Sequence, residues 1–386
     1  MNILRNQKAR NILLQALFLA VVLFIVIGGW TNAQATLQSQ RIVSGFGFLQ
    51  KSTGWDVAFS LLPANANDPY WWFFVVGIVN TLFLGILGLV LATLIGAIVG
   101  MARTSSNHLL QLLGRIYVDI FRNIPVILQL FFWYALITHL PNPRNAIAFG
   151  PLTLSNRGIY MPALNVGGWY LAAAAAAFVA ALILALWLAT TRRIATPREE
   201  RRPLILGALA AGLLLAVLLL ALGRVPGQPL IGVPQLQGLN IRGGLRVSPE
   251  FTALLVAIGI YGGAYIGEIV RGGFKAVGRG QVEAAWTLGL SPWQAFSRIR
   301  FPLALRAMLP ILANQYIWLI KATTLGIAIG FTDFFMIVAV TINQSGQTIE
   351  AIGILMAGFL AINLSIAAIF NRINKAIALR GNQLRS

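Results

Sequence analysis

"QVEAAWTLGLSPWQAFSRIRFPLAL", residues 281–305, is a short polar stretch between two strongly apolar parts of the chain. Residues 276–288 have helical character, and Gly289 can end that helix because glycine adopts the left-handed C′ conformation at little cost. The stretch therefore predicts a first short helix that stops at a glycine turn.

A second short helix is predicted to start directly after that turn. Ser291 suits the N-cap, Pro292 suits the first helical position, and Gln294 completes a capping box. Phe301-Pro302 is expected to end this helix, because proline disfavours helical backbone in the residue before it. The result is a helical hairpin between two apolar segments. From these residues alone, an interfacial hairpin that only anchors two spans is as good an interpretation as a docking element.

The composition of the whole chain is that of a membrane protein. Of 386 residues, 58% are hydrophobic and 10% are charged, whereas soluble domains carry about 25% charged residues. The net charge of +19 raises the possibility of a nucleic-acid partner, but the basic residues gather at the ends of apolar runs. We therefore expect a lipid bilayer and no nucleic acid. There is no cysteine, and His108 and His139 lie far apart, so no metal site is expected.

A spanning helix needs about 20 apolar residues, and the hydropathy pattern predicts about eight of them. The first run follows three basic residues, as a signal peptide does, but it is longer than a usual h-region, so we expect an uncleaved span. The third is short, and Lys321 interrupts the seventh. The fourth and fifth are Ala/Leu runs, interpreted as a peripheral hairpin, with a regulatory or lipid-headgroup site as the alternative. The expected spans are 12–30, 73–101, 124–140, 168–190, 203–223, 251–270, 309–331 and 351–371.

The distribution of Lys and Arg among the loops predicts the orientation. If the N-terminus is cytoplasmic, 21 of the 29 basic residues lie in inside segments, seven lie outside, and Lys321 lies within a span. Basic residues are enriched in cytoplasmic loops. Both termini and the opening stretch are therefore expected to be cytoplasmic.

The opening stretch resembles the EAA loop of ABC importer permeases. Glu283-Ala284-Ala285 is followed after three residues by Gly289, after nine more by Ile299, and after two more by Pro302. The family has Leu-Pro at the end, where this chain has Phe301-Pro302. The resemblance implies that the hairpin, about 276–302, is a coupling helix that docks on an ATP-hydrolysing subunit. The residues implied in coupling are Glu283, Ala284, Ala285, Gly289, Arg298, Ile299 and Pro302.

Other stretches resemble the polar amino acid uptake branch, which contains the histidine, glutamine and arginine permeases. "LIKATTLGIAIGFTD" and "YVDIFRNIPVILQLFFWY" are two of them. "GFGFL" and "SNRGIYMP" are similar to outer loops of the larger first permease of general L-amino-acid and glutamate/glutamine/aspartate/asparagine transporters. The resemblance implies an all-α integral membrane protein with the type I ABC importer permease fold.

This resemblance also implies the function and the partners. The chain is expected to be a non-catalytic permease subunit of an ATP-driven importer of polar L-amino acids in the bacterial inner membrane. The implied partners are an ABC ATPase dimer that binds ATP and magnesium, a second permease in a heterodimer, and a periplasmic amino-acid-binding protein. No cofactor is expected on this chain, which has no P-loop. The implied parts are 1–72 (first span and outer loop), 73–140 (first part of the core), 141–250 (inserted loops and extra hairpin) and 251–386 (second part of the core).

The substrate path is expected to use polar groups within the spans, because such groups are costly there and usually functional. Lys321 is the main candidate, since it could meet a substrate carboxylate. The alternative is a structural role against Asp333, Glu268 or a helix C-terminus. The other candidates for the path are Thr323, Thr324, Asp333 and Gln129.

Two other classes of function stay open at this stage. One is a permease of the same architecture for another small solute. The other is a secondary transporter or channel, which would have no need of a docking hairpin. An intramembrane enzyme is disfavoured, because the chain shows no nucleophile and base set and no intramembrane aspartate pair.

Overall fold

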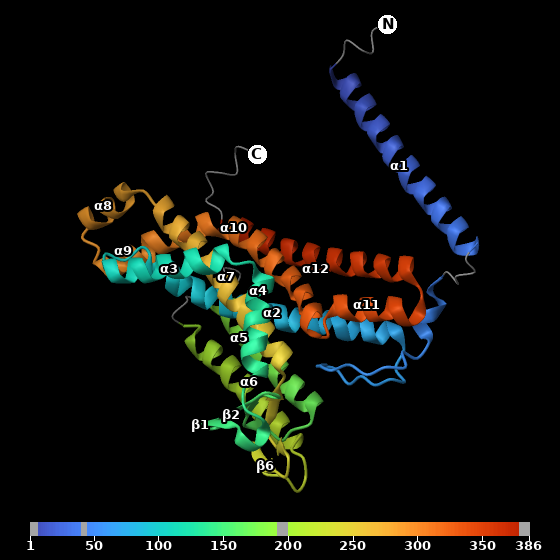
Figure 1. The fold of residues 1–386 in the computed structure, drawn as a ribbon. Helices are drawn as coiled ribbons and strands as arrows, with labels where there is room; N and C mark the ends of the chain where they lie inside the picture. The colour runs from blue at the N-terminus through green and yellow to red at the C-terminus, as the bar shows by residue number, and fades with distance from the viewer. Residues whose placement is uncertain (1–6, 40–44, 191–199, 378–386) are drawn as a thin grey trace. The chain divides into compact units, whose positions relative to one another are not determined.

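The structure, a computed structural model, describes residues 7–39, 45–190 and 200–377. The chain divides into two compact units, and Figure 1 shows the elements of each. The first unit combines residues 1–129 with 254–386, and the second comprises residues 130–253.

Most of the described chain is helical. Three of the described elements are 3₁₀ segments, η1 (Phe46–Gln50), η2 (Pro143–Asn145) and η4 (Ala322–Ile329), and η3 (Phe296–Arg300) is a π-helix. The α-helices are α1 (Gln7–Ser39), α2 (Tyr70–Ala102), α3 (His108–Asn123), α4 (Val126–Thr138), α5 (Gly168–Thr190), α6 (Arg202–Leu222), α7 (Pro249–Ala276), α8 (Arg279–Thr287), α9 (Pro292–Ala295), α10 (Phe301–Lys321), α11 (Phe334–Ser345) and α12 (Thr348–Ile377).

Seven of the described helical segments are long and apolar enough to cross a membrane, or eight if a bent pair counts as one span. That pair is α3 and α4, which meet at an angle of 100°. The expected third span corresponds to α4, which has 13 residues and is too short to cross alone. The expected helical membrane fold is confirmed.

The expected break at Phe301-Pro302 is wrong. Phe301 has helical backbone angles, and one helical segment runs from Pro292 to Ile329 through a π-turn. The amide of Phe301 donates to the carbonyl of Phe296, five residues back. A π-turn is one residue wider than an α-turn, which makes room for the Pro302 ring at the start of α10. The span expected at 309–331 is therefore the far end of a longer helix.

The core of the first unit lies where α2 meets α11. Phe73 and Phe334 are fully buried there. The Asn80 amide donates to the carbonyls of Phe59 and Thr332, and the Thr81 hydroxyl accepts from the amide of Phe334 at 3.0 Å. Asn80 therefore joins two segments far apart in sequence, as polar side chains commonly do between membrane helices.

Glycines let α2 approach α7 closely. A β-carbon at Gly96 would lie 2.6 Å from Ile266, and one at Gly88 would lie 2.8 Å from Ile258. Small residues at such spacings allow membrane helices to pack backbone to backbone. This contact fixes the end of α7 from which the hairpin emerges.

The second unit adds short strands that the sequence analysis did not anticipate. β1 (Ile147–Phe149), β2 (Leu152–Ser155), β3 (Gly158–Met161) and β8 (Leu245–Val247) form an antiparallel sheet in the order β1-β2-β3-β8. Two further pairs are β4 (Ala163–Leu164) with β5 (Ile231–Gly232), and β6 (Gln235–Gln237) with β7 (Asn240–Arg242).

These strands close the base of the apolar hairpin of α5 and α6. β3 pairs with β8 through Ile159 and Val247. An isolated bridge joins Val166 to Arg224, just outside the two helices. Backbone hydrogen bonds thus join the ends of the hairpin, in addition to the packing of α5 against α6.

Candidate functional site

The turn of the hairpin is built on Gly289. Its φ of 74° lies in the left-handed region. The amide of Leu290 donates to the carbonyl of Ala285 at 3.1 Å, and the amide of Gly289 donates to that of Trp286 at 2.9 Å. This pair of bonds is the Schellman arrangement, so the expected glycine stop of α8 is confirmed.

The second arm begins at the expected cap. The Ser291 hydroxyl accepts from the amide of Gln294, and the Gln294 side chain accepts from the amide of Ser291 at 2.9 Å. Both bonds of the capping box are present. Hence local sequence fixes both ends of the turn, and the path of the chain through it is defined without help from other elements.

Aromatic side chains hold the hairpin to the end of α7. The rings of Phe274 and Phe296 stack with centroids 5.8 Å apart. Trp293 continues the stack at 5.9 Å from Phe296, and the Arg300 guanidinium lies 5.4 Å from the Phe274 ring centre. Stacked rings and cation–π contacts each add to simple apolar burial. The hairpin is therefore joined to α7 through this stack and to α10 through continuous helix.

The hairpin presents large apolar side chains at its surface. Trp286 is 59% exposed, Leu288 is 78% exposed and Trp293 is 72% exposed. Together with the exposed Glu283, they form what we call the crest. Sequence reasoning did not single out the three apolar residues, although aromatic residues in a short polar stretch are a usable signal for an interface.

The structure separates the residues expected to act in coupling into two groups. Glu283, Ala284, Gly289 and Arg298 are exposed on the hairpin, whereas Ala285 is buried. Ile299 and Pro302 are half-buried, at the π-turn and the start of α10. The first group is available to a partner, and the second holds the hairpin together.

Gln129 lies at the bend between α3 and α4. It is buried, and its side-chain amide donates to the carbonyls of Phe121 and Ile124, both at 2.9 Å. Those carbonyls lie at the C-terminal end of α3, where the last C=O groups have no N–H donor within the helix. Gln129 thus donates hydrogen bonds to backbone carbonyls that would have no donor at the 100° bend.

Three other residues expected on the path are engaged with nearby backbone. The Thr323 hydroxyl donates to the carbonyl of Ile320, and the Thr324 hydroxyl donates to that of Lys321, both at 2.8 Å. Asp333 is fully buried and caps α11 by accepting from the amide of Met336 at 2.8 Å. These contacts shape the backbone that follows α10.

Lys321 is exposed at the C-terminal end of α10. Within residues 7–39, 45–190 and 200–377, it forms no ion pair with Asp333 or Glu268. Glu268 is instead shared by Arg103 and Arg271. Lys321 is the last residue of α10, but the helical segment continues through η4 to Ile329, so Lys321 does not lie at a free helix C-terminus either.

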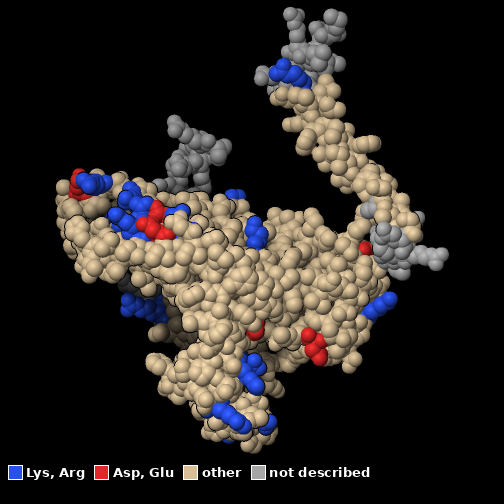
Figure 2. All heavy atoms as spheres, in the orientation of Figure 1, with Lys and Arg blue, Asp and Glu red and all other residues tan. Residues whose placement is uncertain are grey.

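The charged side chains are concentrated near the hairpin. Figure 2 shows Lys and Arg gathered with a few acidic groups on one end of the first unit, while the surface along the spans is almost free of charge. No group of three or more His, Cys, Asp or Glu able to hold a metal occurs in the part of the chain that the structure describes.

Comparison with known proteins identifies the family. The chain is 39% identical over 373 residues, 94% of its length and 93% of the relative's, to a putative amino-acid ABC transporter permease of Escherichia coli K12. The chain belongs to the ABC importer permease family. The family described as "Binding-protein-dependent transport system inner membrane component" matches residues 213–380.

Two further relatives also match along most of their length. A general L-amino acid transport system permease of Rhizobium johnstonii is 36% identical over 97% of this chain and 94% of its own. A glutamate/glutamine/aspartate/asparagine transport system permease of Rhodobacter capsulatus is 30% identical over 97% of this chain and 95% of its own. The chain is thus a multi-pass permease component of a binding-protein-dependent ABC importer, as the EAA pattern indicated.

Proposed function

We propose that this permease imports polar L-amino acids and that the hairpin of α8, α9 and η3 is the element that docks on the ATPase subunit. The exposed crest of Glu283, Trp286, Leu288 and Trp293 carries the proposal. Large apolar side chains around a charged one are typical of the centre of a protein interface. The amino-acid class rests on the relatives, whose names specify amino acids.

The hairpin is firmly connected to α7 and α10, so a movement of the hairpin would move both helices. Its turn is fixed by the Schellman bonds and the capping box, and its second arm continues without a break into α10. The Phe274–Phe296 stack joins the same arm to α7. When the ATPase dimer closes around ATP and magnesium, the hairpin would move as a unit and tilt α7 and α10 together. Such a tilt could switch the permease between two states of access.

The other proposed parts of the importer follow from the family. The chain is a non-catalytic subunit that pairs with a second permease, and a periplasmic binding protein delivers substrate from outside. The proposed orientation has both termini in the cytoplasm of a bacterial inner membrane. It rests on the basic residues, because this orientation puts 21 of the 29 Lys and Arg residues in cytoplasmic segments. That orientation places the crest on the side where ATP is found.

For the substrate path, we propose that Lys321 contacts the substrate carboxylate. Its ammonium group is exposed, and the described acidic residues leave it without an ion-pair partner. Thr323, Thr324 and Asp333 support it by shaping the turn after α10, and Gln129 supports the bend between α3 and α4.

Copurification and uptake together test this function. The tagged permease, expressed with its neighbouring subunits, is expected to retain an ATPase, and membrane vesicles are expected to take up radiolabelled polar amino acids only with ATP. A Glu283→Ala/Trp293→Ala variant should lose most of the copurifying ATPase. The control variant, Arg372→Ala/Lys375→Ala, replaces two exposed residues near the end of α12 and should retain the ATPase. Uptake without ATP or without an ATPase would refute the proposal.

A further inference from the structure

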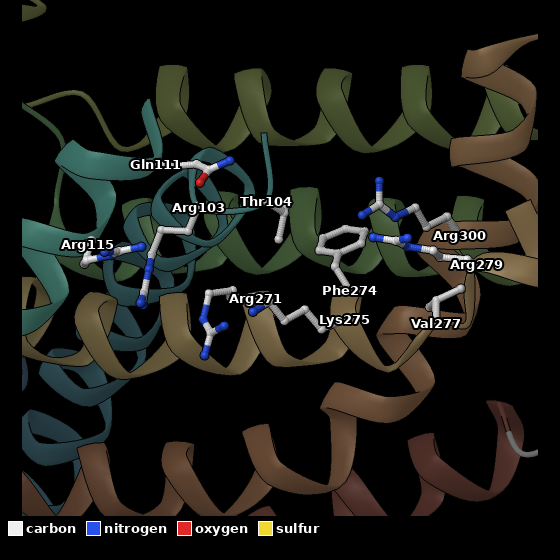
Figure 3. A pocket seen from close by; sticks show the side chains of 10 residues that line it. All are labelled: Arg103, Thr104, Gln111, Arg115, Arg271, Phe274, Lys275, Val277, Arg279 and Arg300. Atoms are coloured by element: carbon white, nitrogen blue, oxygen red, sulfur yellow. The ribbon is translucent and has the colours of Figure 1, made fainter. Parts of the chain in front are cut away.

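A cavity lined by basic side chains lies beside the hairpin, and two of its lining residues, Arg279 and Arg300, belong to the hairpin itself. Its volume is about 430 Å³, within the range of ligand pockets, about 300–1,000 Å³. Figure 3 shows the side chains that surround it. They come from the ends of α2 and α7, from α3, from the start of α8 and from η3. The lining residues are Arg103, Thr104, Gln111, Arg115, Arg271, Phe274, Lys275, Val277, Arg279 and Arg300.

The lining contains six cationic side chains and no acidic one. In the described part of the chain, the two ion pairs in this region join Arg103 and Arg271 to the one carboxylate of Glu268. Arg115, Lys275 and Arg279 have no ion-pair partner among the described residues. Like charges brought together around a partly enclosed space repel one another. An anion in the cavity would relieve that repulsion.

The apolar surface of α3 shows which side of the cavity is next to lipid. Five apolar residues with large exposed fractions, 46–62%, lie along one face of this helix: Leu109, Leu112, Leu113, Ile116 and Ile120. Gly114 and Val118 are buried on the opposite side, and Gln111 and Arg115 line the cavity. An exposed apolar face of this size on a membrane protein is suited to contact with lipid, so the wall of the cavity formed by α3 lies next to the bilayer.

The ends of the spanning helices give the depth of the cavity in the bilayer. Arg103 follows the last residue of α2, and Arg271 and Lys275 lie in the final turns of α7. Both helices are apolar enough to span the bilayer. The cavity therefore opens where the apolar spans end, which is the depth of lipid phosphate groups.

We propose that this cavity binds the phosphate of an anionic phospholipid headgroup. Basic pockets between membrane helices at the cytoplasmic side are suited to such headgroups. Arg115, Lys275 and Arg279 would provide charge-assisted hydrogen bonds to the phosphate oxygens, while Arg103 and Arg271 stay held by Glu268. The proposal depends on the chain being a multi-pass membrane protein, and not on the hairpin docking an ATPase.

This site is tested by measuring lipid binding to the purified importer. The importer is kept assembled with its partner subunits in a neutral detergent. Dioctanoyl phosphatidylglycerol, dioctanoyl phosphatidylcholine and inorganic phosphate are titrated separately, and bound molecules are counted by native mass spectrometry. Phosphatidylglycerol is expected to bind the wild-type importer, and phosphatidylcholine and inorganic phosphate at least about tenfold more weakly.

A matched pair of variants locates the site. Arg115→Gln/Lys275→Gln removes two lining charges, and binding of phosphatidylglycerol should weaken by up to roughly thirtyfold, since each cation near an anionic lipid contributes roughly fivefold. Arg372→Gln/Lys375→Gln removes two exposed charges at the end of α12 and should leave binding unchanged.

Three results would overturn the proposal. The first is equal binding of phosphatidylglycerol by the two variants. The second is inorganic phosphate binding as tightly as the lipid, which would make the cavity a site for a soluble anion. The third is lipid binding to the isolated permease that disappears in the assembled importer, because an acidic surface of the partner would then fill the cavity.

Discussion

Replacement of Gly289 by valine isolates the role of the hairpin turn. The residue has a φ of 74°, and a β-carbon added to it would meet no atom within 4 Å. The substitution therefore causes no clash, and its whole effect is the strain of a branched side chain in the left-handed region. That strain is about 1–2 kcal/mol, which corresponds to a fivefold to thirtyfold change in an equilibrium.

This energy acts on the angle between α8 and α9. Release of the strain would break the two Schellman bonds, from Leu290 to Ala285 and from Gly289 to Trp286, and would change the angle at which α9 follows α8. Only the fraction of molecules that keep the turn can dock, so the apparent affinity for the ATPase should fall by up to the same fivefold to thirtyfold.

The assay measures ATPase binding to purified permease, together with insertion and melting temperature. Gly289→Asn is the matched control, because asparagine tolerates the left-handed region and should bind within about twofold of wild type. The spans should keep their melting temperature in both variants. If Gly289→Val binds the ATPase as Gly289→Asn does, the turn does not position a docking surface.

Three further changes test other parts of the structure. Ser291→Ala removes a capping-box bond, costs about 1 kcal/mol, and should weaken ATPase binding severalfold as measured by the same assay, whereas Ser291→Asp should restore it. Lys321→Met should leave membrane insertion and ATPase binding intact but sharply lower amino-acid uptake in vesicles; wild-type uptake would remove Lys321 from the substrate path. Deletion of residues 170–222 should leave measurable uptake, because the Val166–Arg224 bridge already brings the cut ends together; a well-inserted deletion without uptake would show that α5 and α6 are required.

The elements that the sequence predicted well are those controlled by local rules. Gly289, Ser291 and Gln294 act within a few residues of themselves, and each has the role expected of it. The long apolar runs predicted the spans for the same reason. A helix that crosses a bilayer needs about 20 apolar residues, whatever other helices pack against it.

The errors arose where neighbours decide the outcome. Pro302 was expected to end a helix, but the wider π-turn before it accommodates the ring, and that turn is stabilised by the Phe274–Phe296 stack from another helix. The short strands of the second unit pair segments on both sides of α5 and α6, as Ile159 does with Val247. Such long-range pairs leave no periodic signal in a single sequence.

The candidate site was predicted only in part. The EAA spacing located the hairpin, but it did not point to the exposed Trp286, Leu288 and Trp293, because exposure depends on the packing of the rest of the molecule. For the substrate path, polar character in a span did not separate a residue open to a ligand from one bonded to backbone. Gln129 belongs to the second kind.

Site-specific crosslinking from the crest tests the central claim most directly. The chain contains no cysteine, so a single introduced cysteine reports on one position. Leu288→Cys, labelled with a photoactivated maleimide crosslinker in the assembled importer, is predicted to give an adduct with the mass of permease plus ATPase. Lys375→Cys, exposed at the end of α12, is predicted to give none. An importer in which the ATPase copurifies but Leu288→Cys forms no adduct with it would contradict the account.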